Sequence, residues 1–269
     1  MTYSTLEIDV RDGIGRVWLN RPAVRNAFDD TAIAELTQAF SALGGDPAAR
    51  IVVLGGRGSA FSAGGDLNWM QKMAGYSFDE NYADALVLAD MLHTIATLPK
   101  PTIARVHGPA YAGGMGLVAA CDIAVAADAA EFCLSEVKLG LVPATISPYV
   151  LAAMGRRAAQ RYFLTAERFS AAEAHRIGFV HMLVPAAGID DAVAGICREL
   201  LAGGPDAHAA TKELVREVAG APFTPELRAD TARRIAAARA TDEGREGVRA
   251  FLEKRRPGWL PKKGPSQQT

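Results

Sequence analysis

The sequence predicts an α/β fold followed by a helical C-terminal region. Short apolar runs typical of strands alternate with segments of helical periodicity in the N-terminal part of the chain, and every segment after Pro185 has a helical pattern. Strands that are followed by helices in this way favour an α/β core. We therefore expect a core at residues 1–200, a helical region at residues 201–260 and a flexible polar tail at residues 261–269.

Each predicted element rests on its periodicity and its flanking residues. A hairpin is expected where apolar runs lie on either side of Arg11-Asp-Gly13. The next helix has Asp29 or Asp30 as its N-cap, and a later helix stops before Pro99. The predicted strands are residues 6–10, 14–19, 51–54, 102–106, 122–126, 131–134 and 179–184. The predicted helices include residues 30–43, 79–97, 147–165, 170–178, 190–202, 205–219, 225–240 and 242–255.

Two glycine-rich turns are the most informative local feature. Phe61-Ser-Ala-Gly-Gly-Asp66 and Ala112-Gly-Gly-Met-Gly116 each follow a predicted strand, and helices are expected to start at Leu67 and Leu117. A helix N-terminus presents N–H donors without partners, and glycine lets a ligand approach the backbone closely. Two such turns can direct two N–H groups at one oxygen atom, which is what an oxyanion hole requires.

The composition favours small-molecule chemistry in the cytoplasm. The 29 Lys and Arg residues balance 30 Asp and Glu residues, so no overall field attracts nucleic acid or an anionic membrane. Cys121, Cys133 and Cys197 fit neither a disulfide framework nor a CxxC metal site, and the histidines lack ligand spacing. The most apolar stretch, residues 117–130, is interrupted by two aspartates, so no membrane span is expected.

Taken together, the motifs resemble the crotonase (enoyl-CoA hydratase/isomerase) superfamily from Leu6 to about Trp259. The resemblance implies a crotonase fold, which is a repeated ββα spiral core, with a C-terminal helical region that assembles a homotrimer or homohexamer. It also implies an acyl-CoA substrate, with coenzyme A as part of the substrate and no separate cofactor. The segments that carry it are Leu19-Asn-Arg-Pro22, Asn26-Ala27, Ala60-Phe-Ser-Ala-Gly-Gly-Asp66, Pro101-Thr-Ile-Ala104, His107-Gly108, Ala112-Gly-Gly114, Ala120-Cys-Asp-Ile123 and Ser135-Glu-Val-Lys-Leu-Gly-Leu-Val-Pro143.

The resemblance also implies roles for individual residues. It assigns the N–H groups of Gly65 and Gly113 to the thioester oxygen, and Glu136 to proton transfer at the α-carbon. Apolar neighbours, among them Leu139, are expected to surround Glu136 and to raise its pKa. Asp66 is at the same time a candidate helix cap, and Trp69 is expected either in the acyl pocket or in the core. The candidate substrate and CoA contacts are Arg25, Ala63, Asp66, Leu67, Tyr111, Gly116 and Lys254.

Gly116 is where the sequence departs from the family pattern. Hydratases of this family that use two glutamates have the second one at the matching position, and glycine cannot activate water. If the enzyme is a hydratase that positions water without a second carboxylate, we expect the surroundings of Gly116 to leave space for substrate or water. The stretch after Pro143 is also altered, reading Ala-Thr-Ile-Ser-Pro148.

Three functions remain open. The first is hydration of an acyl-CoA that has a second carboxylate, because the sequence looks most like bacterial methylglutaconyl-CoA and isohexenylglutaconyl-CoA hydratases. Such a carboxylate needs a cationic or hydrogen-bonding partner, for which the candidates are Lys72, Lys138, Ser147 and Tyr149. The second is Δ3-Δ2 enoyl-CoA isomerisation by Glu136 alone. The third is a non-catalytic acyl-CoA-binding or RNA-associated protein, which the neutral charge and the retained Glu136 disfavour.

Overall fold

The computed structural model describes residues 2–260, and the chain divides into two compact units after Cys197. The first unit contains the sheets and both glycine turns, and the second is helical. The predicted tail at residues 261–269 lies outside the described residues. Within residues 2–260, no helix is both long enough and apolar enough to cross a membrane.

A six-stranded sheet is the framework of the first unit. Its first pair of strands is antiparallel and every later pairing is parallel. In spatial order the strands are β1 (Leu6–Arg11), β2 (Ile14–Leu19), β3 (Ile51–Gly56), β4 (Thr102–Val106), β6 (Ile123–Ala127) and β9 (Met182–Val184). A second, three-stranded sheet consists of β5 (Ala110–Tyr111), β7 (Glu131–Cys133) and β8 (Phe169–Ser170). The short β5 and β8 were not predicted, because two residues cannot show a period.

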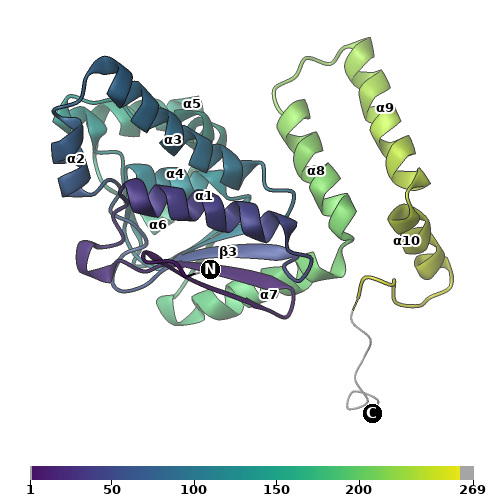
Figure 1. Ribbon diagram of the computed structural model, residues 1–269. Coiled ribbons are helices and arrows are strands. Elements are labelled where there is room, and N and C mark those ends of the chain that lie inside the picture. The colour runs from purple at the N-terminus through teal and green to yellow at the C-terminus, as the bar shows by residue number, and fades with distance from the viewer. Residues whose placement is uncertain (1, 261–269) are drawn as a thin grey trace. The chain divides into compact units, whose positions relative to one another are not determined.

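Helices cover the larger sheet (Figure 1). Four of them pack in series and bury a continuous apolar core: α1 (Asp30–Gly45) packs on α3 (Phe78–Ala96), α3 packs on α4 (Gly113–Ala120), and α4 packs on α5 (Ser147–Thr165). The helices of the first unit are η1 (Pro22–Val24), α1 (Asp30–Gly45), α2 (Leu67–Met73), α3 (Phe78–Ala96), α4 (Gly113–Ala120), η2 (Glu136–Leu139), α5 (Ser147–Thr165), α6 (Ala171–Arg176), η3 (Ala186–Gly188) and most of α7 (Ile189–Ala202).

Side-chain caps define several helix starts, and the one at Asp29 confirms a prediction. The Asp29 carboxylate accepts the N–H of Ala32 at 3.0 Å, which makes Asp29 the N-cap of α1. Ser77 and Glu80 form a complete capping box at the start of α3. Ser170 caps α6 through the N–H of Glu173.

Three predicted boundaries were wrong for local reasons. Helix α4 begins at Gly113, not Leu117, because the chain enters the helix directly from the turn at Ala112. Strand β9 begins at Met182, not at residue 179. The N–H groups of Phe179 and Val180, which are both buried, donate to the Ala174 carbonyl and close the end of α6, so these two residues are not in the strand. Helix α10 ends at Leu252, not at residue 255, because Lys254 is left-handed with φ 52°.

The second unit contains α8 (Pro205–Val218), α9 (Pro225–Ala240) and α10 (Asp242–Leu252). Glu243 at the start of α10 accepts the N–H groups of Asp206 and Ala207 at 3.1 and 2.8 Å, so it caps α8 from another helix. The Trp259 indole N–H donates to the Ala202 carbonyl at 3.0 Å and ties the end of the described chain to the start of this unit.

We predict that Asp122→Ala destabilises the protein. One Asp122 oxygen accepts both the N–H and the hydroxyl of Thr102, at 2.7 and 2.8 Å, and Thr102 is fully buried. The variant leaves these groups without that acceptor, at a cost of roughly 1–3 kcal/mol for each unsatisfied group. Urea unfolding measures the loss. The exposed Asp128→Ala is the control, and equal stability of the two variants would contradict this role of Asp122.

Candidate active site

The first glycine turn is fixed by a backbone bridge to Phe28. The Phe28 N–H donates to the Gly64 carbonyl at 2.8 Å, and the Asp66 N–H donates to the Phe28 carbonyl at 3.0 Å. In such a parallel bridge, the residue between the two bonded positions directs its own N–H away from the partner strand. That residue is Gly65, and among residues 2–260 its N–H has no acceptor.

Asn26 is the side chain that holds this turn from behind. It is buried, its Oδ1 accepts the N–H of Arg21 at 2.9 Å, and its Nδ2 donates to the Ala60 carbonyl at 2.8 Å. The hydroxyl of Ser62 in turn donates to the Asn26 carbonyl at 2.9 Å. Asn26 could be identified from the sequence only as part of a motif, because the contacts of a buried amide cannot be deduced from one sequence.

The second glycine turn lies directly beside the first. The Tyr111 N–H donates to the Ser62 carbonyl at 2.9 Å. Gly64 has φ +87°, and a Cβ there would lie 2.9 Å from the Tyr111 carbonyl oxygen and 3.4 Å from the Gly113 nitrogen. Glycine is therefore required at residue 64 both by its conformation and by the close approach of the other turn.

The Gly113 N–H is directed by a strained residue. Ala112 precedes α4 with φ 46° and ψ −120°, a conformation that residues with a Cβ rarely adopt. Gly113 is the first residue of α4, so its N–H has no partner within the helix, and none exists elsewhere in the described part of the chain. The two turns touch each other, and each carries one N–H donor without an acceptor in the described chain. These donors belong to Gly65 and Gly113, which are both half-buried.

Glu136 lies close to the second turn. The Ala112 N–H donates to the Cys133 carbonyl at 2.8 Å, and Glu136 follows Cys133 by three residues, a span of at most about 11 Å. The Oε2 atom of Glu136 is buried without a hydrogen-bond partner among the described residues. Burial raises the pKa of this carboxyl, against a smaller lowering by its own backbone N–H.

The apolar surroundings of Glu136 are only partly as expected. Phe132 and Leu134 are buried, but Leu139 is 59% exposed and does not enclose the carboxyl. The reason is that η2 ends at the left-handed Gly140 and carries Leu139 to the surface.

The expectation of open space at Gly116 is wrong. A Cβ at Gly116 would lie 2.3 Å from Ile146 Cγ2 and 3.6 Å from Leu92 Cδ2. Gly116 is buried in α4 where α5 packs against that helix, and Ile146, just before α5, is 2% exposed. The position that would hold a second carboxylate is filled by an isoleucine side chain.

Arg25 and Ala63 lie together at the protein surface. The Arg25 carbonyl accepts the Ala63 N–H at 3.0 Å, and Arg25 has φ 54°. The Arg25 side chain is exposed and has no ionic or hydrogen-bonded partner within residues 2–260. Leu67, at the start of α2, is 81% exposed. A cation without an internal partner beside the first turn is available to a phosphate-bearing ligand.

Asp66 and Tyr111, two further candidate contacts, have internal partners instead. Asp66 caps α2 by accepting the Asn68 N–H at 2.8 Å, and it pairs with Arg21 at 3.1 Å. The Tyr111 hydroxyl donates to Glu131, and burial together with this bond raises the pKa of Tyr111 to about 12. Lys254 belongs to the second unit, whereas the residues of the two turns and Glu136 belong to the first.

The four candidate partners for a substrate carboxylate also differ in whether their side chains already have a partner within the protein. Lys72 pairs with Asp30 at 2.7 Å, and Lys138 donates to the Ala166 carbonyl at 2.7 Å. The Ser147 hydroxyl donates to the Ala144 carbonyl at 2.8 Å. Tyr149 alone has no side-chain hydrogen bond in the described chain; it is half-buried, and burial raises the pKa of its hydroxyl.

No metal centre is visible in the described residues, which hold no group of three or more His, Cys, Asp or Glu side chains arranged around a common point. Cys121, Cys133 and Cys197 are all buried and form no disulfide. Two backbone donors without internal acceptors, one desolvated carboxyl and the side chains around them make up the candidate site.

Comparison with known proteins places this geometry in a family. Residues 9–262 match the enoyl-CoA hydratase/isomerase family. The crystal structure of an enoyl-CoA hydratase from Shewanella pealeana is 41% identical, with a TM-score of 0.93 over 95% of this chain and 96% of that one. An enoyl-CoA hydratase from Mycobacterium smegmatis is 35% identical, with a TM-score of 0.89 over 95% of this chain and 99% of that one.

A relative from Thermus thermophilus, which carries the name of an enoyl-CoA hydratase, is 38% identical over 241 residues, or 90% of this chain and 95% of its own length. These likenesses extend over both units and confirm the crotonase fold predicted from the sequence. The chain belongs to the enoyl-CoA hydratase/isomerase family.

Proposed function

We propose that this protein is an enoyl-CoA hydratase, a lyase that adds water across the double bond of an α,β-unsaturated acyl-CoA. The observation that carries the proposal is the buried Oε2 of Glu136, which has no partner in the described chain, close to the turn that carries the Gly113 donor. A buried polar atom without a partner is costly and needs an explanation. A substrate that completes the site supplies one, and the names of the relatives point to the same chemistry.

In the proposed mechanism, the N–H groups of Gly65 and Gly113 donate to the thioester oxygen. The oxygen of water attaches to the β-carbon, and the negative charge that arrives on the thioester oxygen is stabilised by the two donors. Glu136 delivers a proton to the α-carbon, and a proton from the added water restores its carboxyl. One oxyanion donor contributes roughly 10²–10³ in rate. The raised pKa of Glu136 suits it to act as an acid at a higher pH than an exposed glutamate.

We propose further that the acyl group is branched and carries a second carboxylate, as in 3-methylglutaconyl-CoA. Tyr149 supports this, because its hydroxyl is the one candidate partner that no other residue in the described chain engages. It lies in the first turn of α5, a helix that packs against η2, the element that carries Glu136. A neutral phenol can donate to a carboxylate without a second buried charge.

Δ3-Δ2 enoyl-CoA isomerisation is the second candidate. It is favoured by the packing of Ile146 against Gly116, which leaves no room for a second carboxylate to activate water. A single shuttling carboxyl is sufficient for this reaction. A non-catalytic role is disfavoured by the desolvated and unpaired Glu136, which would only cost stability in a protein without this chemistry.

For the CoA part of the substrate, we propose contacts with Arg25, with the backbone of Ala63 and with the exposed side chain of Leu67. Arg25 offers a charge without an internal partner in the described residues, and coenzyme A offers phosphates. Lys254 and Tyr111 remain weaker candidates, the latter because its hydroxyl is bonded to Glu131. No separate cofactor is required by the mechanism, since every step uses substrate, water and Glu136.

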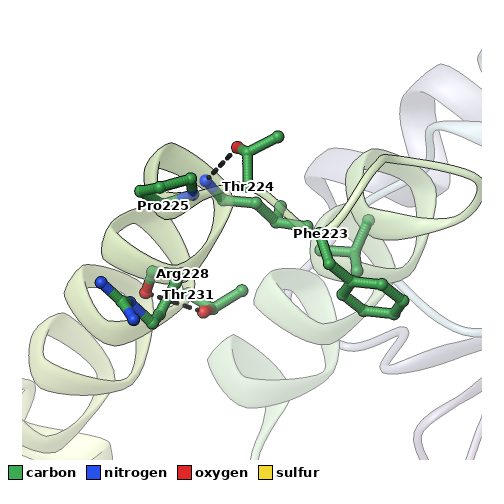
Figure 2. A pocket seen from close by; sticks show the side chains of 7 residues that line it. Phe223, Thr224, Pro225, Arg228 and Thr231 are labelled. Carbon is green, nitrogen blue, oxygen red and sulfur yellow. Dashed lines mark hydrogen bonds between the residues drawn. The ribbon is translucent and has the colours of Figure 1, made fainter.

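We also propose that the second unit mediates assembly into a homotrimer or homohexamer. Its helices expose apolar side chains that a single chain leaves in water: Val215, Ile235, Val248, Phe251 and Leu252 are between 50% and 82% exposed. A hollow between α8 and α9 is lined by Phe223, Thr224, Pro225, Arg228 and Thr231 (Figure 2), and Phe223 is 99% exposed. These residues carry no acid–base pair and fit a packing surface.

The assembly is tested by light scattering on the purified protein. We expect three or six times the chain mass of 28.4 kDa. Phe251→Asp places a charge on the exposed apolar surface of α10 and should lower that mass, whereas Thr211→Ser, at an exposed polar residue outside the hollow, should not. A wild-type mass of one chain at micromolar concentration would contradict the proposal.

The reaction and substrate are tested with three thioesters. Wild-type protein should hydrate 3-methylglutaconyl-CoA with a higher kcat/KM than crotonyl-CoA, and should convert 3-enoyl-CoA slowly. Tyr149→Phe should lower kcat/KM for 3-methylglutaconyl-CoA by roughly 10-fold, the value of about one hydrogen bond to a charged group, and leave crotonyl-CoA unaffected. Absorbance of the conjugated thioester reports all three. Efficient isomerisation without any hydration would establish the second candidate instead.

Glu136→Gln is expected to abolish turnover while CoA binding persists. The amide keeps the shape but cannot exchange a proton, so kcat should fall by at least roughly 10²–10⁴. Glu173→Gln is the control, because Glu173 has internal partners in Tyr162 and Arg176. Unchanged kcat in Glu136→Gln would move the acid–base chemistry to another residue.

Glu136→Gln is also expected to change how the stability of the protein depends on pH. The folded state holds the Glu136 proton more tightly than the unfolded state, so wild type loses stability as pH rises from the ordinary pKa of 4.5 through the raised one. Glutamine does not titrate. The stability of Glu136→Gln relative to wild type should therefore increase over that interval and level off above it, as measured by urea unfolding at a series of pH values.

A further inference from the structure

We infer that Phe28 and Trp69 form an aromatic brace that sets the spacing and direction of the two oxyanion donors, and that they act as positioning residues in the reaction. The inference rests on the proposed function of Gly65 and Gly113. It concerns residues that do not themselves touch the thioester in the mechanism above. Phe28 and Trp69 are 2% and 8% exposed, so both are core side chains.

Each ring lies against one of the donor glycines. A Cβ at Gly113 would fall 2.3 Å from Phe28 Cζ and 3.2 Å from both Cε atoms, so the edge of the phenyl ring supports that residue. A Cβ at Gly65 would fall 3.2 Å from Trp69 Cζ3 and 3.3 Å from Cε3, so the indole supports the other donor. Neither glycine can move toward its ring without displacing it.

The two rings also contact each other. Their centroids are 6.3 Å apart and their planes are tilted by 53°, within the range of favourable aromatic pairs. The separation of the two donors is thus coupled to the packing of two rigid side chains. Phe28 has a second role, because its N–H and carbonyl form the bridge on either side of Gly65. One residue therefore supports Gly65 through its backbone and Gly113 through its ring.

The indole is fixed at its far end by α3. The Trp69 Nε1–H donates to Asp84 Oδ1 at 3.1 Å. Because an indole is rigid, this bond sets the orientation of the ring edge that faces Gly65. Met70 also reaches Gly65, with its Cγ 3.6 Å from a Cβ at that position, but a flexible thioether chain cannot hold a fixed distance in the same way.

Loss of the brace should act on the transition state more than on substrate binding. The charge on the thioester oxygen is greatest in the transition state, so misplaced donors lower kcat and leave KM nearly unchanged. Phe28→Leu removes the ring edge below Gly113. We expect kcat to fall by roughly 10- to 100-fold, less than the 10²–10³ for complete loss of a donor, with KM changed by less than about threefold.

Phe40→Leu is the matched control. Phe40 is as fully buried as Phe28, but it lies in α1 and supports neither glycine. Both variants remove a ring from the core, so both should lower Tm to a similar extent. Only Phe28→Leu should lower kcat.

A spectroscopic readout separates positioning from general destabilisation. Butyryl-CoA is a suitable ligand because it has no double bond to hydrate. We would label it with ¹³C at the thioester carbon and record the infrared carbonyl band of the ligand bound to each protein. Hydrogen bonds from both donors should shift this band to lower wavenumber in wild type and in Phe40→Leu. In Phe28→Leu the band should lie closer to that of free butyryl-CoA.

Asp84 provides a second route if Phe28→Leu does not fold. Asp84→Leu removes the acceptor of the indole N–H and should lower kcat severalfold with the same change in the carbonyl band. Asp84→Asn keeps an oxygen that can accept this bond and should restore both readouts.

The outcomes distinguish the brace from the function on which it rests. If the wild-type band is shifted but Phe28→Leu and Asp84→Leu keep both the shift and the wild-type kcat, the brace is refuted and the oxyanion hole stands. If the wild-type band is not shifted at all, the assignment of Gly65 and Gly113 is wrong, and the brace fails with it.

Discussion

The close approach of two chain segments at Gly64 is the constraint on which the site depends. Gly64 has φ +87° and lies within contact distance of the Tyr111 carbonyl and the Gly113 nitrogen, so any side chain there would separate the turns. The bridge from Phe28 holds the first turn, and the bond from Tyr111 to Ser62 holds the second against it. Beside this junction, the strained Ala112 precedes Gly113, which carries the second donor.

A buried network offsets the cost of this arrangement. The Asn26 amide uses its oxygen and its nitrogen within the protein, the Ser62 hydroxyl is bonded, and the Asp66 carboxylate is both a cap and an ion-pair partner of Arg21. Polar groups that are satisfied in this way make a site rigid. Against this background, the N–H groups of Gly65 and Gly113 and the buried Oε2 of Glu136 lack internal partners in the described chain, as does the buried Nδ1 of His107. The first three lie in the two turns or close to the second one. Their lack of internal partners indicates a ligand more strongly than any single motif does.

Much of the fold could be predicted from the sequence because its elements are regular. The helices at residues 30–43 and 79–97 have clear periodicity and caps, and they occur as α1 and α3. The missed elements, β5 and β8, are short and depend on tertiary pairing. The turns could be located from their glycines. The bridge between Phe28 and Gly65, however, joins residues that are 37 positions apart, and no local pattern encodes it.

The side-chain environment was harder to predict than the backbone. Gly116 was expected beside open space if the enzyme is a hydratase with one glutamate, yet Ile146, just before α5, fills that volume. Leu139 was expected to enclose Glu136, but the turn at Gly140 carries it outward. Both errors concern which long-range neighbour occupies a volume, a question that depends on helix packing and not on local sequence.

The most direct measurement of the central claim is a crystal structure of the protein with butyryl-CoA, a saturated ligand that cannot be hydrated. The thioester oxygen is expected within 2.7–3.2 Å of both the Gly65 and the Gly113 nitrogen, roughly the range of an N–H···O bond. The α-carbon is expected to face the Glu136 carboxyl. A thioester oxygen bound to neither glycine, or an α-carbon directed away from Glu136, would contradict this assignment of the site.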